Sequence, residues 1–224
     1  MRARKGRLKK LAGKVHTIRY VRLPSLYQPN FLLAWNRCIC SNIIDNKIKL
    51  ITNDLLRSEG IKELIKKEKP CEIYNFAAQS SVGLSFEFPK ETKNSIELIT
   101  SNLLNACRDL EYAGGIFFAG SSEMFGETAT PANCNTKLNP RSPYGYAKTK
   151  SYLMVKKYRE NYGLKCATGI FFNHESKLRS NNFVTQKIIH FAKNIFNGLN
   201  SKINLGNTEV IRDWGYAVEY VEAA

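Results

Sequence analysis

The sequence predicts an α/β fold, a doubly wound parallel sheet, from residue 46 onward. Apolar runs of strand length alternate there with longer segments that carry an apolar residue at every third or fourth position. Alternation of that kind is typical of a parallel sheet with helices on both faces. The 224 residues, 43% of them hydrophobic, are enough for one domain or for one domain and part of a second.

Strands and helices are expected in alternating order along this part of the chain. The apolar runs predict strands at 47–52, 72–78, 115–120 and 165–172, and the longer patterns predict helices at 55–69, 92–112 and 144–162. The apolar stripe of the first helix is Leu56, Ile61, Leu64 and Ile65. Ser142 suits the N-cap of the last helix and Pro143 its first position, so that helix should begin just before Tyr144.

Positive charge is concentrated at the start of the chain. The formal net charge is +15, but residues 1–44 hold ten Lys or Arg and no acidic residue. The remaining 180 residues carry 24 basic and 19 acidic residues. The body of the chain therefore lacks the charge of a nucleic-acid-binding surface, and we expect no nucleic-acid partner. Binding of polyanions by the basic start alone is the alternative.

The cysteine and hydropathy patterns favour a cytoplasmic protein with reduced thiols. The six cysteines are scattered, and only Cys38 and Cys40 lie close together, at a spacing that fits no common zinc site. No run reaches the roughly 18 apolar residues that span a bilayer, so we expect no membrane partner. The basic, acid-free start also fits a transit peptide, although it is poor in Ser, and this alternative stays open.

Small polar and acidic side chains follow three of the predicted strands. Gln79 to Ser81 follow the strand at 72–78, Ser121 to Glu123 follow the strand at 115–120, and Asn173 to Glu175 follow the strand at 165–172. Ligands of open α/β sheets bind outside the carboxyl ends of the strands, so these groups should line a site. Any one cluster alone would more often be ordinary loop polarity.

Three tyrosines of the helix at 144–162 each have a lysine four residues later. These pairs are Tyr144/Lys148, Tyr146/Lys150 and Tyr152/Lys156. Residues four apart share a helix face, so an ammonium group can lower the pKa of a phenol there. Only Tyr144 lies at the helix start, next to the sheet edge; Tyr146 points roughly 200° away, and Tyr152 lies roughly 12 Å farther along. We therefore expect chemistry from Tyr144/Lys148 and packing or solvation from the other two pairs.

Short motifs identify the family that residues 52–224 resemble. They are DL at 54–55, EIYNFAAQS at 72–80, SSEMFG at 121–126, PRSPY at 140–144, NHES at 173–176, NFVT at 182–185, LGN at 205–207 and RDWG at 212–215. Together they resemble the GDP-mannose 4,6-dehydratase family, extended short-chain dehydrogenases/reductases with a Rossmann fold. NHES, NFVT and RDWG are specific to this dehydratase within the wider superfamily, whereas Y-x-x-x-K is not.

The resemblance implies a catalytic group of Ser121, Glu123, Tyr144 and Lys148. Tyr144 would be the base for the sugar 4-hydroxyl, with Lys148 as its partner and as a contact to the cofactor ribose. Ser121, where the family usually has Thr, would assist at that hydroxyl. Glu123 would take the C5 proton and help to expel the C6 oxygen. Elimination requires a C4 ketone that acidifies C5, so one nicotinamide must accept hydride from C4 and return it to C6.

The cofactor implied by the resemblance is NADP, and the substrate is GDP-mannose. The cofactor would contact Asp54 and Leu55 near the adenine, Phe76, Ala77, Ala78, Gln79 and Ser80 along the pyrophosphate and ribose, and His174 and Arg179 near the nicotinamide. GDP-mannose would contact Asn173, Asn182, Val184, Lys187 and Arg212, of which Arg212 suits a diphosphate clamp. Asn182 and Lys187 fit a solvated helix surface equally well.

The expected organisation has three parts. Residues 1–46 form an atypical basic segment, residues 47–172 an NADP-binding Rossmann core with the catalytic residues, and residues 173–224 a partial substrate-binding region. The sequence contains no G-x-x-G-x-x-G, the turn whose amides cradle the pyrophosphate, so we expect the first strand of the sheet to be missing with it. Glu91 stands where the family has a cofactor-contacting Tyr, and Lys177-Leu178 replace a Pro-Arg pair.

The leading functional hypothesis is GDP-mannose 4,6-dehydratase, a hydro-lyase of GDP-deoxyhexose synthesis. Strand 1 is central in the 3-2-1-4-5-6 order, so its loss would leave backbone groups unpaired and favours an alternative: an inactive remnant, or a non-enzymatic partner of a full-length relative. A related nucleotide-sugar dehydratase or epimerase is a further alternative. Glu123 beside Ser121 favours dehydration over epimerisation. The oligomeric state is left open, with a homo-oligomer as one possibility.

Overall fold

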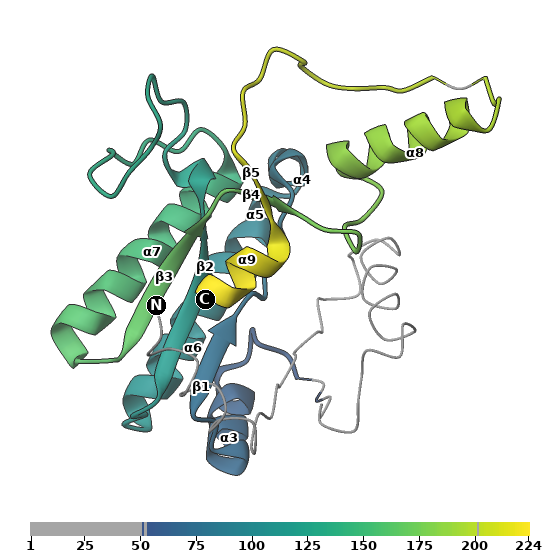
Figure 1. Cartoon of the computed structure of the whole chain (residues 1–224). Coiled ribbons are helices and arrows are strands. Elements are labelled where there is room, and N and C mark those ends of the chain that lie inside the picture. Colours follow the sequence, from purple (N-terminus) through teal and green to yellow (C-terminus); the bar gives the residue numbers. More distant parts are fainter. Residues whose placement is uncertain (1–50, 52, 201) are drawn as a thin grey trace, which may run out of the picture. The chain divides into compact units, whose positions relative to one another are not determined.

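The computed structural model describes residues 51, 53–200 and 202–224 (Figure 1). The predicted strand at 47–52, apart from Ile51, and the basic segment at 1–46 therefore lie outside the described residues. The described chain falls into two compact units, which divide between Ile170 and Phe171. Among the described residues, no helix combines the length and the apolar character that crossing a membrane requires.

The first unit contains a three-stranded sheet in the order β1-β2-β3. Its strands are β1 (Glu72–Asn75), β2 (Gly115–Ser121) and β3 (Cys166–Phe171), and β1 and β2 are parallel, with Glu72 opposite Gly115. The strand predicted at 72–78 ends three residues early. Asn75 explains this end, because its Oδ1 accepts a hydrogen bond from the Ala77 amide at 3.1 Å and starts a turn.

Helices α3 (Ser58–Glu68), α6 (Ile99–Asp109) and α7 (Pro143–Tyr162) pack with this sheet around one apolar core (Figure 1). Ile61, Leu64 and Ile65 of the predicted stripe are buried in α3. Leu56 precedes the helix instead of belonging to it, because the Asp54 carboxylate accepts from the Leu56 amide at 3.1 Å and holds residues 54–56 in a turn. The main core contains Ile61, Ile65, Leu103, Leu104, Ala106, Cys107, Ile116, Phe118, Val155, Leu164 and Cys166.

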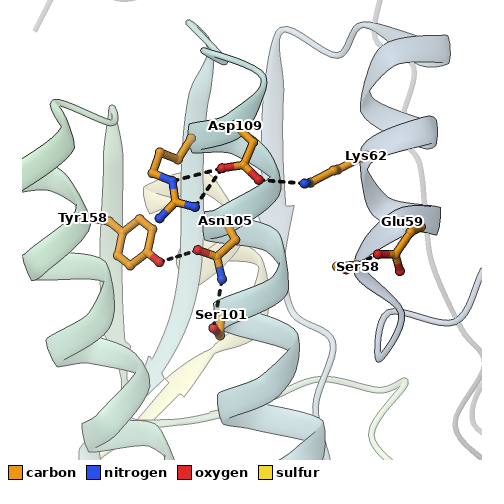
Figure 2. A network of polar contacts seen from close by, with 8 residues as sticks. Ser58, Glu59, Lys62, Ser101, Asn105, Asp109 and Tyr158 are labelled. Atoms are coloured by element: carbon orange, nitrogen blue, oxygen red, sulfur yellow. Dashed lines mark hydrogen bonds and ion pairs between the residues drawn. The ribbon is translucent and has the colours of Figure 1, made fainter.

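Polar contacts join the outer sides of the same three helices (Figure 2). The Lys62 ammonium of α3 lies 2.6 Å from the Asp109 carboxylate of α6. The Tyr158 hydroxyl of α7 donates to the Asn105 amide oxygen of α6 at 2.6 Å. Exposed ion pairs contribute only about 0–1 kcal/mol each, so the core carries most of the stability and these contacts fix which side chains face each other.

The helix predicted at 92–112 contains a π-helical turn. Helical backbone runs through α5 (Pro89–Lys93), the π turn η1 (Asn94–Leu98) and α6 without a break. The Ile96 carbonyl in this turn accepts from the hydroxyls of Thr100, at 2.7 Å, and Ser151 of α7, at 3.4 Å. A widened turn of this kind is frequent at functional sites. The short helix α4 (Val82–Glu87), capped by Ser81, was not predicted.

The second unit consists of elements that the sequence patterns did not predict. Strands β4 (Asn173–Glu175) and β5 (Trp214–Tyr216) form a parallel pair, and helices α8 (Val184–Phe196) and α9 (Ala217–Ala223) complete the unit. Each strand has three residues, too few for an alternating pattern to be recognised in the sequence. In the described chain, neither α8 nor α9 has a buried residue.

Candidate active site

The start of α7 brings the predicted tyrosine to the end of β2. Ser142 is the N-cap, as predicted: its hydroxyl accepts from the Gly145 amide at 3.0 Å, and Pro143 occupies the first turn. Gly145 allows the helix to approach the turn that follows β2, because a Cβ there would lie 2.7 Å from the Glu123 carbonyl oxygen. The sequence Ser-Pro-Tyr-Gly therefore sets Tyr144 next to the segment that carries Ser121 and Glu123.

Tyr144 and Lys148 form a buried pair on one face of α7. Each is 8% exposed, and the Lys148 ammonium lies 5.7 Å from the centre of the Tyr144 ring. The ammonium also donates to the Ala119 carbonyl of β2 at 2.7 Å, which fixes the helix to the strand. Burial lowers the pKa of Lys148 to about 8. Lys148 thus places a cation, whose pKa lies not far above neutral pH, beside the phenol of Tyr144.

The other two Tyr-Lys pairs of α7 have different surroundings. Tyr146 is 58% exposed, and Lys150 is exposed as well. Tyr152 is half-buried, while Lys156 is exposed and lies 4.0 Å from the Glu160 carboxylate. Of the three pairs, only Tyr144/Lys148 has both members buried.

Ser121 and Glu123 lie at the carboxyl end of β2. Ser121 is the last residue of the strand, 8% exposed, and its hydroxyl accepts from the Glu123 amide at 3.3 Å. Glu123 is half-buried in the 3-10 turn η2 (Ser122–Met124). The hydroxyl of Ser121 thus shapes the turn that presents the Glu123 carboxylate. Ser121 ends the strand whose Ala119 carbonyl accepts the Lys148 hydrogen bond, and Glu123 follows that strand.

The loop after β1 also reaches this region. Ala78 packs, together with Val82, against the small cluster of Ile96, Tyr144 and Ala147. This loop therefore forms part of the wall around the Tyr144 ring. In the same loop, Ala77 is half-buried, Phe76 is 51% exposed and Ser80 is exposed, so their surfaces are open to a ligand.

Gln79 has a different environment from its neighbours in that loop. Its side chain is 3% exposed, and its Nε2 donates to the Ser81 carbonyl at 2.8 Å and to the Thr92 hydroxyl at 3.0 Å. Its backbone amide donates to the Ser95 hydroxyl at 3.3 Å. Gln79 therefore anchors the loop to the helix that follows. Sequence reasoning missed Thr92 and Ser95, because two hydroxyls in a predicted helix carry no periodic signal of their own.

Asp54 and Leu55 take part in local structure and in the core. The Asp54 carboxylate accepts from the Leu56 amide and lies 3.8 Å from Arg57. Leu55 packs its side chain against the main core, and its carbonyl accepts from the Asn102 amide at 3.1 Å.

A small cavity lies beside Lys148. Its volume is about 10 Å³, the space of roughly one water molecule. Asn75, Thr100, Ser151 and Thr168 contribute polar groups to its lining. The Thr168 hydroxyl is buried and makes no hydrogen bond among the described residues. Lys148 thus borders a small space that has polar groups in its lining.

Within the second unit, His174 and Arg179 are held by neighbouring side chains. The Nδ1 atom of His174 lies 2.9 Å from the Phe172 carbonyl oxygen. The Arg179 guanidinium lies 3.4 Å from the Glu175 carboxylate and 3.4 Å from the centre of the Phe183 ring. Both predicted cofactor residues are therefore fixed within their own unit, whichever group they bind.

The predicted substrate residues are mostly exposed within the second unit. Asn173 is half-buried in β4, whereas Asn182 and Val184, at the start of α8, and Lys187, inside it, are exposed. Arg212 is exposed too, and its guanidinium donates to the adjacent Ile211 carbonyl at 3.1 Å. The exposed side chains of Asn182, Val184, Lys187 and Arg212 are therefore accessible to a ligand.

Comparison with known proteins assigns the family. The model of the family described as GDP-mannose 4,6 dehydratase matches residues 30–224. The chain belongs to the GDP-mannose 4,6-dehydratase family. It is 42% identical to GDP-mannose 4,6 dehydratase 1 of Arabidopsis thaliana over 186 residues, which are 81% of this chain and 52% of that protein. It is 40% identical to the Homo sapiens GDP-mannose 4,6 dehydratase over 183 residues, 80% of this chain and 49% of the relative.

A solved structure shares the fold. UDP-glucose 4-epimerase from Brucella ovis, in complex with NAD, superposes with a TM-score of 0.60 at 26% identity, over 74% of this chain and 47% of that chain. The Rossmann fold predicted from the sequence is confirmed. The chain spans about half the length of the curated dehydratases that it matches.

The residues of this GDP-mannose 4,6-dehydratase family member fit a nicotinamide cofactor in part. The open loop of small residues after β1 and the buried Lys148 fit the ribose and nicotinamide end, since they offer close approach and a cation at the sheet edge. Leu55 does not fit a side-chain contact to adenine, because that side chain packs into the core. Gln79 does not fit a side-chain contact to the pyrophosphate or the ribose, because its amide is engaged by Ser81 and Thr92.

Proposed function

We propose that the protein acts as a GDP-mannose 4,6-dehydratase, converting GDP-mannose to GDP-4-keto-6-deoxymannose with a recycled NADP. The product serves GDP-deoxyhexose synthesis, for example that of GDP-fucose. The observation that carries the proposal is the buried Tyr144/Lys148 pair beside Ser121 and Glu123, in a chain of the dehydratase family.

Tyr144 is proposed to remove the proton of the sugar 4-hydroxyl. A buried ammonium 5.7 Å from the ring centre stabilises a phenolate relative to the phenol, so that a larger fraction of Tyr144 is available as a base at neutral pH. Ser121 is proposed to hold the same hydroxyl by a hydrogen bond. Its fixed position at the end of β2 suits that role, because orientation of the reacting group contributes much of the rate.

Glu123 is proposed to catalyse the elimination of water across C5 and C6. Once C4 is a ketone, the C5 proton is acidic, and a carboxylate can take it while the C6 oxygen leaves as water. The same carboxyl group can return its proton to the departing oxygen. Glu123 is half-buried and adjacent to Ser121, so one turn of chain would serve both the C4 and the C5 steps.

NADP is proposed as the cofactor, held at its ribose by Tyr144 and Lys148 and along its length by Phe76, Ala77, Ala78 and Ser80. When bound, it accepts hydride from C4 and returns it to C6, so no net oxidation occurs. His174 and Arg179 are proposed to contact the nicotinamide end. The preference for NADP over NAD rests on the family resemblance. Parallel titrations with NADPH and NADH measure this cofactor preference.

GDP-mannose is proposed to be bound by Asn173, Asn182, Val184, Lys187 and Arg212. Arg212 suits the diphosphate, since a guanidinium forms paired hydrogen bonds with phosphate oxygens. The exposed guanidinium has no carboxylate partner among the ion pairs of the described residues, which leaves its charge available.

The test is turnover of GDP-mannose by the purified chain with NADP, with Tyr144→Phe as the decisive variant. We expect formation of the 4-keto-6-deoxy sugar, and a loss of kcat of about 100-fold or more in the Tyr144→Phe variant, because general acid–base groups contribute about 10²- to 10⁴-fold. The product is followed by mass spectrometry and by its alkaline absorbance.

Tyr146→Phe is the matched control. It removes the same hydroxyl from the same helix at a position that is 58% exposed, and it should leave kcat unchanged. Equal losses in both variants would contradict the assignment of Tyr144. A folded chain that binds no NADPH and turns over no substrate would instead favour the non-catalytic alternative, a partner of a full-length relative.

A further inference from the structure

The NHES and RDWG motifs meet in the second unit. They lie on β4 and β5, which pair in parallel with His174 directly opposite Gly215. Helix α9 begins at Ala217, directly after β5, and places Tyr220 against His174 of this pair. Strands β4 and β5 and helix α9 therefore meet around the imidazole of His174.

Tyr220 stacks on the ring of His174. The two ring centres lie 5.0 Å apart, and the ring planes differ by 28°. Phe171 makes edge-on contacts with both rings, and its ring centre lies 5.2 Å from that of His174 and 5.4 Å from that of Tyr220. Stacked and edge-on contacts together restrict rotation of the imidazole about its side-chain bonds.

Gly215 makes room for the tyrosine. A Cβ atom at this position would overlap Cε2 of Tyr220 and lie 3.1 Å from its hydroxyl oxygen. The ring could not move far to relieve that overlap without losing its stack on His174. The glycine of RDWG is thus explained by the close approach of Tyr220, since its backbone needs no unusual dihedral angle.

One hydrogen bond decides which nitrogen of His174 is free. Nδ1 lies 2.9 Å from the Phe172 carbonyl, and a carbonyl oxygen only accepts. In the neutral imidazole Nδ1 must therefore carry the proton, and Nε2 is left as a hydrogen-bond acceptor. An acceptor of this kind suits an N–H donor, such as the carboxamide of nicotinamide.

We propose that Tyr220 and Gly215 are positioning residues that hold His174 in one orientation, with Nε2 presented as an acceptor for the carboxamide N–H of the cofactor. The assignment of the ligand rests on the proposed function, whereas the fixed orientation of the imidazole rests only on the contacts within this unit. A role of Tyr220 in packing alone would not select one tautomer.

The first experiment records long-range 1H–15N spectra of the full chain. The chain has only three histidines, and His174→Asn identifies the signals of interest. We expect the Nδ1–H tautomer of His174 in the wild type and in Tyr220→Phe, which keeps the ring. Tyr220→Leu and Gly215→Ala should each show both tautomers. Tyr216→Leu, an exposed position on the same strand, is the control and should match the wild type.

The second experiment titrates each variant with NADP and with its analogue that carries a carboxylate in place of the carboxamide. The wild type should prefer the carboxamide, because a carboxylate has no N–H to donate. Tyr220→Leu should bind NADP about three- to tenfold more weakly, the range expected for an aromatic pair, and should lose the preference. Tyr220→Phe should retain the wild-type affinity for NADP and the preference for the carboxamide.

Three outcomes would overturn the inference or its ligand assignment. If Tyr220→Leu and Gly215→Ala keep the wild-type tautomer while folded, as judged by circular dichroism, Tyr220 does not position His174. If the wild type binds NADP without preferring the carboxamide, the ligand assignment is wrong. A wild type that binds neither dinucleotide would refute the ligand assignment together with the proposed cofactor, and the spectra would still decide the role of Tyr220.

Discussion

Lys148 is a buried ammonium whose pKa burial lowers from 10.5 to about 8. Between pH 8 and 10.5 the unfolded chain holds this proton and the folded chain does not, so the contribution of Lys148 to the free energy of unfolding rises with pH through this window. The Lys148→Met variant lacks that rise. We expect its free energy of unfolding, relative to the wild type, to fall by about 3 kcal/mol between pH 7 and pH 11.

Urea denaturation of both proteins at several pH values measures this difference. Other titrating groups are common to both proteins and cancel. Lys150→Met is the matched control, since Lys150 is exposed two residues farther along the same helix. The free energy of unfolding of this variant, relative to the wild type, should not change with pH. If the free energy of unfolding of Lys148→Met, relative to the wild type, is also independent of pH, Lys148 is not desolvated in the folded protein.

Individual side chains differ in how far the sequence predicts their place. Helix geometry alone singled out Tyr144 from Tyr146, and the buried and exposed positions of these two agree with it. The same reasoning could not separate Gln79 from Ser80, because which loop residue turns inward depends on the hydroxyls of Thr92 and Ser95, far along the chain. Tertiary partners of this kind leave no local pattern.

At the scale of the elements, the start of α7 depends on one cap. The Ser142 hydroxyl accepts from the Gly145 amide at 3.0 Å, and Ser142 itself is 4% exposed. Ser142→Ala should lower the free energy of unfolding by about 1 kcal/mol, because an amide at the helix start loses its acceptor. The turn that frays first carries Tyr144, so any activity of the chain should fall more than stability alone explains.

Chemical denaturation and hydrogen exchange of the Gly145 and Tyr146 amides measure the effect of this cap. Ser142→Asp supplies another side-chain acceptor and a favourable charge at the helix start, so it should restore most of the loss. Equal stability of Ser142→Ala and the wild type would mean that the preceding residues, not the cap, hold the start of α7.

The long elements of the first unit were predictable, and their irregular parts were not. The periodic pattern predicted a helix at 144–162, and the structure has α7 at Pro143–Tyr162. The pattern for 92–112 did not reveal the π turn at Asn94–Leu98, in which the Ile96 carbonyl accepts from the Ser151 hydroxyl of another helix. Asn75 and Asp54 shortened a strand and a helix through turns that use their own side chains.

At the scale of the whole molecule, the alternation of strands and helices predicted the fold of the first unit but not the second. The strands and helices of the first unit alternate along the chain, as the pattern predicts. Strands β4 and β5 have three residues each, and their pairing joins segments some forty residues apart. Only the family motifs marked that region in the sequence, and they indicated chemistry without indicating structure.

The core of the first unit supplies the last prediction. Leu104 of α6 is 0% exposed, in the cluster that joins α3, α6, α7 and the sheet. Leu104→Ala should lower the free energy of unfolding by about 2–5 kcal/mol, because it removes buried methyl groups and leaves a cavity that packed neighbours cannot fill. Leu98, 41% exposed in the preceding π turn, is the control, and Leu98→Ala should cost less than about 1 kcal/mol. Urea unfolding followed by far-ultraviolet circular dichroism compares the variants. Similar losses for both would show that the three helices do not share one core, because a leucine at their junction would then matter no more than one at the surface.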